Sequence, residues 1–123
     1  MTQFSFNRAE GIVFHDSTPI CTIAYSGNGD GLNNPAMQEV HNVGPLPEGL
    51  YTIGPAKNPI DELGPIALEL IPDPSNEMFG RFGFFIHGDN QLMNYTASNG
   101  CIILPRAVRQ YIEESPDKLL SVI

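Results

Sequence analysis

The chain carries two cysteines, and one of them, Cys101, has neighbours that suit a reactive thiol. A cysteine becomes a nucleophile when a nearby group favours its thiolate, most simply a histidine that takes the proton. His87 precedes Cys101 by 14 residues and ends the apolar run FGFFIH. Glycine flanks both residues, in HGDN and SNGC, and allows a close approach of substrate and backbone. The pair therefore predicts nucleophilic chemistry at Cys101 with His87 as its base.

Spacing alone leaves two other interpretations of Cys101 open. Free cysteine is among the most buried residue types, so a thiol ahead of IIL could be structural. A Cys21–Cys101 disulfide is also possible, although two cysteines make no disulfide framework and show no CxxC metal spacing. Cys21 alternates within an apolar run without a histidine or glycine turn nearby, and we expect it in the core. We predict a free thiol at Cys101, with no metal and no cofactor.

Length and charge exclude several classes of function. A chain of 123 residues fits one domain, residues 1–123, with a core of its own. The net charge is −8 with only six basic residues, so we expect neither nucleic acid nor an anionic membrane as a partner. No signal peptide pattern is recognisable, and no apolar run approaches the roughly 18 residues of a membrane-spanning helix. We expect synthesis in the cytoplasm and no membrane insertion.

Short runs of β-branched and aromatic residues between turns predict a mostly β fold, and the 12 glycines and 11 prolines supply those turns. One helix is expected over 105–116, with Pro105 as its first residue and Pro116 beyond its end. The polar stretch 26–35 is expected to be a surface loop, and loops of that length are often functional. The expected strands cover 3–6, 11–15, 18–25, 50–53, 66–71, 82–87, 101–104 and 118–123.

Three segments, in this order, resemble the signature segments of the L,D-transpeptidase (YkuD-type) superfamily: GPLPEGLYTIG (44–54), GFFIHGDN (83–90) and ASNGCIIL (97–104). A closer resemblance is to a small branch of bacterial L,D-transpeptidase-like proteins, some of them antibacterial effectors delivered by type VI secretion. SGNGDGLNNP (26–35), GRFGFFIHGDN (80–90) and ASNGCIILPR (97–106) fit that branch. The resemblance implies a compact YkuD-like β-sandwich or curved mixed sheet with one C-terminal α-helix.

The resemblance also implies a role for each matching residue. Cys101 would be the nucleophile and His87 its general base, while Ser98 would orient the histidine or shape the pocket. The backbone N–H groups of Asn99, Gly100 and Cys101 are the implied oxyanion donors.

Further residues are expected around this centre. A carbonyl of Gly88 or Ser98 would hold the second imidazole nitrogen of His87. Asp89 and Asn90 would bind an ammonium or amide group, or else form a solvated turn. Arg106, preferred over Arg81, would meet a substrate carboxylate. The expected substrate-binding set is Gly88, Asp89, Asn90, Asn33, Arg106 and Tyr51, of which Asn33 and Tyr51 also suit a plain loop and the core, respectively.

The reaction implied by the resemblance is acyl transfer on peptidoglycan. The Cys101 thiolate would attack the meso-diaminopimelate carbonyl of a tetrapeptide stem and expel D-Ala. Water, a free D-amino acid or another stem would then resolve the thioester, which gives L,D-carboxypeptidase, exchange or cross-linking activity. We favour trimming and exchange, because a small domain leaves water and small amines easy access. Stem peptides, a cognate immunity protein and a secretion apparatus are the implied partners, and the periplasm is the implied place of action.

Two alternatives share the same residues. A catalytically silent peptidoglycan-binding module would keep the fold, but binding alone gives no reason to retain Cys101 with His87. A cysteine endopeptidase of cell-wall peptides would differ only in the bond that is cut. Asn99 and Ile102 stand where the wider superfamily usually has His and often Arg or Asn, so the physiological product stays open.

Overall fold

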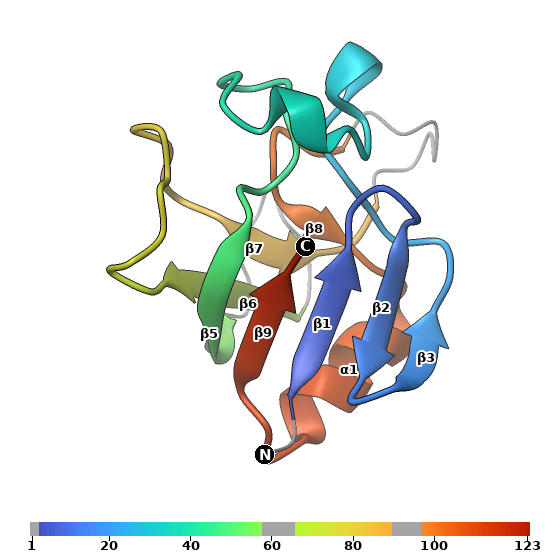
Figure 1. The fold of residues 1–123 in the computed structure, drawn as a ribbon. Helices are drawn as coiled ribbons and strands as arrows, with labels where there is room; N and C mark the ends of the chain where they lie inside the picture. The colour runs from blue at the N-terminus through green and yellow to red at the C-terminus, as the bar shows by residue number, and fades with distance from the viewer. Residues whose placement is uncertain (1–2, 58–65, 90–96) are drawn as a thin grey trace.

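The computed structural model describes residues 3–57, 66–89 and 97–123, which form a mixed nine-stranded sheet with a helix on it (Figure 1). This arrangement confirms the expected mostly β fold, a curved mixed sheet with a C-terminal helix. The strands are β1 (Phe4–Asn7), β2 (Ile12–His15), β3 (Thr18–Cys21), β4 (Tyr25–Ser26), β5 (Gly49–Lys57), β6 (Ala67–Pro72), β7 (Phe85–His87), β8 (Ile102–Ile103) and β9 (Leu119–Val122). The helical elements are α1 (Arg106–Glu114) and two 3₁₀ turns, η1 (Gly29–Gly31) and η2 (Pro35–Met37).

The order of the strands forces the sheet to curl. In the order β3-β2-β1-β9-β5-β6-β7-β8-β4, the two edge strands β3 and β4 are joined only by residues 22–24. A chain of that length spans at most about 14 Å. A flat sheet of nine strands, spaced about 4.8 Å apart, would separate its edges by roughly 38 Å. The sheet therefore folds back on itself, and Figure 1 shows β7 and β8 behind β9 and β1.

Two pairings in this sheet are parallel, β1 with β9 and β7 with β8. In the second pairing Ile86 is opposite Ile102 and His87 is opposite Ile103. The short strand β4 closes this end of the sheet by antiparallel pairing, with Tyr25 opposite Ile103. Three segments that are distant in the sequence thus meet at the end of β7.

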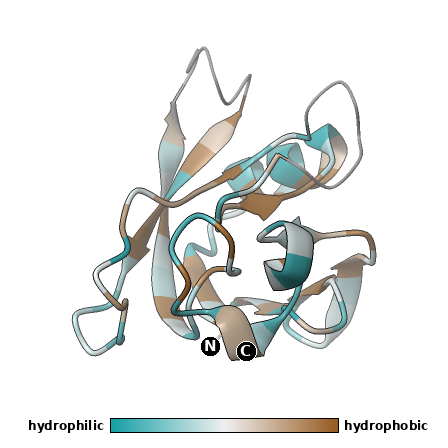
Figure 2. Cartoon of the chain, turned by 90° about the horizontal axis from the view of Figure 1, so that it is seen from above, coloured by the Kyte–Doolittle hydropathy of each residue, from teal (hydrophilic) through white to brown (hydrophobic). Residues whose placement is uncertain are grey.

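Alternating side chains build the core. Phe4 and Phe6 of β1 are both fully buried, as are Leu120 and Val122 of the neighbouring β9, at 2% and 1% exposure. In Figure 2 brown, hydrophobic segments lie on the strands, and much of the teal lies on the helical and loop segments. Among the described residues no helix has the length and apolar character needed to cross a membrane.

Helix α1 covers the core with one face. Its residue Ile112 is 1% exposed, and Val108 packs against the same cluster. Pro105 is the N-cap with extended backbone (ψ 155°), so the helix begins one residue later than expected. It ends at Glu114, because Ser115 precedes Pro116 and is extended, as residues before proline tend to be.

Three expected elements differ most from the structure, and the expected strand 101–104 is also shortened, to β8. The run 18–25 is broken into β3 and β4, because the chain crosses there from one sheet edge to the other. The run 82–87 is shortened to β7, since Gly83 has a φ of +80° and Phe82 is 89% exposed. The stretch 26–35 is not a plain surface loop: it contains η1, and Gly27 and Gly31 are buried.

One polar cluster lies beside α1. The His15 ring contacts the Tyr111 hydroxyl at 2.6 Å through Nδ1 and the Asp117 carboxylate at 2.7 Å through Nε2. It also stacks on Phe4 with 4.4 Å between ring centroids. This cluster ties β2 to the helix and to the residues that lead into β9.

Candidate active site

Cys101 stands immediately before β8 and is partly buried, and both it and Cys21 are free thiols. The backbone N–H of Phe85 donates to Cys101 Sγ at 3.3 Å, which holds the thiol beside the start of β7. His87 ends that strand, two residues after Phe85 and about 7 Å further along. The candidate nucleophile thus immediately precedes β8, and the candidate base ends the neighbouring parallel strand β7.

The face of the sheet is set by alternation. Ile86 and Ile102, paired across β7 and β8, both belong to the hydrophobic core cluster. The next residues on each strand, His87 and Ile103, therefore point to the opposite face, as does Tyr25, the β4 partner of Ile103. His87 is only 5% exposed, so its imidazole is shielded from water.

The hydrogen bond of the His87 ring defines its tautomer. Nδ1 lies 2.9 Å from the carbonyl oxygen of Gly88, one of the two carbonyls considered from the sequence. A carbonyl only accepts, so Nδ1 carries the hydrogen and Nε2 presents a lone pair. Burial lowers the pKa of His87 and the Arg109 charge lowers it further, while the Gly88 bond and Asp89 oppose this. The imidazole is neutral at pH 7 and able to accept a proton.

The thiol is also neutral at rest. Burial raises the pKa of Cys101, against the smaller opposing effects of the Phe85 N–H and the Arg81 guanidinium. A neutral thiol and a neutral imidazole differ from the preformed thiolate–imidazolium pair of some cysteine enzymes. Nucleophilic attack by Cys101 would therefore need a base at the moment of reaction.

Ser98 organises the turn ahead of Cys101. It is fully buried, and its Oγ accepts the N–H of Gly27 at 2.9 Å and of Gly100 at 3.0 Å. The same hydroxyl donates to the carbonyl of Cys101. Of the two roles expected for Ser98, these contacts fit shaping of the pocket. Because the Gly100 N–H donates to Ser98, it does not point to a substrate oxygen in this structure. The oxyanion roles of the Asn99 and Cys101 N–H groups stay predictions.

Gly100 has a steric reason to be glycine. Its φ is +134°, a conformation that side chains disfavour. A Cβ atom there would lie 2.5 Å from Cε1 of Phe84 and 2.6 Å from Nη2 of Arg81. The turn before the thiol is packed too closely for any other residue.

The stretch 26–44 supplies further contacts to this turn. Ser26, fully buried, donates from Oγ to the Gly100 carbonyl at 2.8 Å. Asn28 Nδ2 donates to the Ser98 carbonyl at 2.8 Å and to Asn99 Oδ1 at 3.2 Å. Ser26 and Asn28 are not among the residues predicted for the site, although their motif SGNG was part of the resemblance.

Arg81, which the sequence suggested less strongly than Arg106 as a partner for a substrate carboxylate, also supports this turn. It is 6% exposed, and its guanidinium lies 5.2 Å from the centre of the Phe84 ring. Its position and contacts make it an anchor inside the protein rather than a substrate contact. The guanidinium donates to the carbonyls of Gln38, Pro45, Gly44 and Asn99 at 2.6, 2.8, 2.9 and 3.0 Å.

Two residues of the expected substrate-binding set have structural partners. Asn33 Oδ1 accepts the Ser26 N–H at 3.0 Å, and its Nδ2 donates to the Ala24 carbonyl at 3.3 Å, so the side chain braces β4. Tyr51 is 1% exposed and donates to the Pro47 carbonyl at 2.7 Å.

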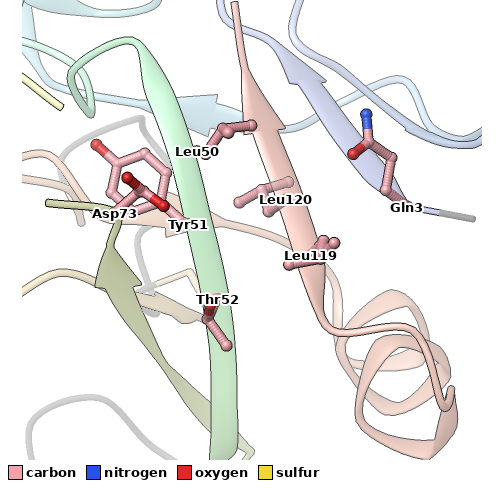
Figure 3. A pocket seen from close by; sticks show the side chains of 7 residues that line it. All are labelled: Gln3, Leu50, Tyr51, Thr52, Asp73, Leu119 and Leu120. Carbon is pink, nitrogen blue, oxygen red and sulfur yellow. The ribbon is translucent and has the colours of Figure 1, made fainter. Parts of the chain in front are cut away.

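Tyr51 also lines a hollow of about 270 Å³ between β5 and β9, two strands from β7 (Figure 3). Figure 3 shows Tyr51 and Asp73 on one side of it and Leu119 and Leu120 on the other.

The remaining expected contacts lie nearer to His87. Asp89 Oδ1 accepts from the Tyr25 hydroxyl at 2.7 Å, and the Ala97 N–H donates to the same hydroxyl at 3.3 Å. Arg106 is exposed at the start of α1. Asn90 lies outside the described residues. Across the described ranges, no three His, Cys, Asp or Glu side chains are grouped to hold a metal ion.

Fold and site together define a small β protein with a partly buried thiol immediately before β8 and a buried imidazole at the end of the paired strand β7. The family model of the Tlde1 domain matches residues 21–119, and the chain belongs to this family. It is a family of type VI secretion effectors, which is consistent with an antibacterial role and with a secretion apparatus and an immunity protein as partners. A comparison with curated proteins found no match.

Proposed function

We propose that this protein is a cysteine acyltransferase that acts on peptidoglycan tetrapeptide stems, with L,D-carboxypeptidase and D-amino-acid exchange as its activities. The observation that carries the proposal is the placement of Cys101 immediately before β8 and of His87 at the end of its parallel neighbour β7, with the thiol held by the Phe85 N–H at 3.3 Å. The motif resemblance supplies the substrate class. Membership in an effector family supports a target in a competitor's cell wall.

In each step of the proposed reaction, His87 accepts or donates the proton that moves. His87 Nε2 takes the Cys101 proton, and the thiolate attacks the meso-diaminopimelate carbonyl of the stem. The carbon–nitrogen bond to D-Ala breaks as the imidazolium returns the proton to the leaving amine. A thioester remains on Cys101. Water or the amine of a D-amino acid then attacks the thioester, His87 again takes the proton, and the thiol is regenerated.

The turn 98–101 is the proposed oxyanion site. Since the Gly100 N–H already donates to Ser98, the N–H groups of Asn99 and Cys101 are the donors we propose for the tetrahedral intermediate. Preorganised donors are most effective when the backbone that carries them does not move. The bonds from Ser26 and Arg81 into this turn supply that rigidity.

Muropeptide analysis tests the proposal. Purified peptidoglycan is incubated with wild type, Cys101→Ala and, as a matched control, Cys21→Ala, with and without added D-methionine. We expect tetrapeptides to become tripeptides, and D-methionine to be incorporated, with wild type and Cys21→Ala only. Unchanged muropeptides together with tight binding to sacculi would favour the catalytically silent peptidoglycan-binding module. Cleavage at another bond of the stem would favour the cysteine endopeptidase. Formation of 3→3 cross-links alone would overturn the preference for trimming and exchange.

We further propose that the protein acts in the periplasm. Expression in Gram-negative cells with and without an added export signal tests this location. Growth inhibition is expected only with the signal and only with Cys101 intact. Equal toxicity of the unexported protein would contradict a cell-wall target.

A further inference from the structure

A hollow of about 300 Å³ lies beside the candidate active site, bordered by β4, the end of β8 and the start of α1. We call it the side hollow. It combines an apolar surface with one carboxylate, one phenol and two guanidinium groups. Its lining residues are Ile23, Tyr25, Asp89, Ile103, Leu104, Pro105, Arg106 and Arg109.

The side hollow adjoins the proposed base. Ile103, which lines it, is the strand partner of His87, and neighbouring strands are about 4.8 Å apart. Asp89, at another part of its wall, follows His87 by two residues. A molecule in the side hollow would therefore contact the strand partner of His87.

Hydrogen bonds from the protein position two of the charged groups of the side hollow. The Tyr25 hydroxyl donates to Asp89 Oδ1 at 2.7 Å, and Arg109 Nε donates to the Leu104 carbonyl at 3.0 Å. Arg106, by contrast, is exposed. The chain has a net charge of −8 and six basic residues, and two of the six line this one hollow. Within an otherwise acidic protein, these arginines attract the carboxylate of a ligand. The Asp89 carboxylate, in the same hollow, attracts an ammonium group.

We propose that the side hollow binds the zwitterionic end of an amino acid, with Asp89 at its ammonium, Arg106 at its carboxylate and Ile23 at its side chain. A volume of about 300 Å³ suits a group of this size, at the lower end of small-molecule sites. Two sources present this chemistry: the free D-amino acid that resolves the thioester, and the diaminopimelate side-chain terminus of the stem. The inference rests on the proposed function and identifies the group that this function recognises.

Binding is measured without turnover, by NMR titration of the Cys101→Ala protein. The probes are D-alanine, meso-diaminopimelate and two blocked compounds, N-acetyl-D-alanine and D-alanine amide. We expect saturable shifts at the amides of Ile23, Asp89 and Ile103 with at least one zwitterion and with neither blocked compound. Arg106→Gln should weaken that binding by about tenfold or more, as the loss of a charge-assisted hydrogen bond does. Lys118→Gln removes the same charge at the other end of α1 and should leave it unchanged.

The outcomes separate the sources and the proposals. Saturation by D-alanine alone would show that the side hollow binds the free D-amino acid that resolves the thioester. Saturation by meso-diaminopimelate alone would show that it binds the diaminopimelate terminus of the stem. Saturation by both would show that it recognises the zwitterionic group that the two share. Absence of saturable shifts with either zwitterion, or equal binding by Arg106→Gln, overturns the inference. Such a failure leaves the muropeptide result intact, because that result depends on Cys101. Conversely, zwitterion binding without any Cys101-dependent product would sustain the subsite and reject the acyltransferase.

Discussion

The Arg81 guanidinium donates a 3.0 Å hydrogen bond to the carbonyl oxygen of Asn99, two residues before Cys101. The same group reaches three carbonyls of the stretch 38–45, so one buried side chain joins that stretch to the turn ahead of the thiol. Its charge also favours the Cys101 thiolate. Arg81 therefore combines a structural and an electrostatic effect, and the two can be measured apart.

Replacing Arg81 by Met should raise the pKa of Cys101 further and lower the free energy of unfolding by at least about 2 kcal/mol, since buried carbonyls lose a charged donor. Arg81→Lys keeps the positive charge, so the pKa of the Cys101 thiol should stay closer to its wild-type value than in Arg81→Met. The Lys variant should still be less stable than wild type. The pH dependence of alkylation by iodoacetamide, in a Cys21→Ala background, measures the thiol alone. Identical alkylation profiles for the Lys and Met variants would show that Arg81 acts only as a structural anchor.

Ser98→Ala should lower the free energy of unfolding by about 2 kcal/mol, because the N–H groups of Gly27 and Gly100 would both be left buried without their acceptor. Ser75→Ala is the matched control: this exposed hydroxyl bonds only the nearby Asp73 carboxylate among the described contacts, and we expect a change within about 0.5 kcal/mol. Urea unfolding compares the two variants. Equal losses in the two variants would mean that the buried hydrogen bonds of Ser98 stabilise the protein no more than the exposed bond of Ser75 does.

The pH profile of activity should follow His87. Burial lowers its pKa below the ordinary value near 6.5, so the neutral, base-competent ring persists into mildly acidic solution. Activity (kcat/KM) should fall only as the pH drops below about 6.5. Asp89 raises the pKa of His87, so Asp89→Asn, which can still accept from Tyr25, should move this acid limb to lower pH. A limb that moves to higher pH in Asp89→Asn would contradict the assignment to His87.

His15→Ala should destabilise the protein without altering the thiol. It removes the contacts of the ring with Tyr111 and Asp117, and we expect a loss of about 1–2 kcal/mol with an unchanged alkylation profile of Cys101. His41→Ala is the comparison, since the exposed His41 ring contacts a single carbonyl, that of Phe79. Thermal unfolding of both variants is the measurement, and a larger effect at His41 would count against the prediction.

Much of the fold and the centre of the candidate site follow from local patterns. Alternation in QFSF predicts β1, with Phe4 and Phe6 inward, and the apolar run before His87 predicts a strand that ends at the histidine. These signals are local because burial of alternate residues repeats within a few positions. The pairing of β7 with β8 then places Cys101, the residue before β8, next to the strand that ends at His87.

The supports of the site have no such local signal. The Tyr25–Asp89 bond joins residues 64 positions apart, and the buried Arg81 has the same sequence character as an exposed arginine. Asn33 and Tyr51 show the opposite case. As a polar loop residue and an aromatic residue they suggest substrate contacts, but their side chains form hydrogen bonds with the backbone of the protein itself. Long-range bonds of this kind depend on the curl of the sheet, which arises from the order of all nine strands.

That order also has a consequence for when the site forms. Strand β9 follows every other element in the chain, yet it pairs between β1 and β5 and joins the two halves of the sheet. Non-local pairings of this kind form slowly, because a long loop must close before they contribute. A growing chain that has not yet released residues 119–122 from the ribosome already contains both Cys101 and His87 but lacks a continuous sheet. We therefore expect the thiol to acquire its native protection only after synthesis has passed Val122, which would delay any activity until the chain is long enough to fold.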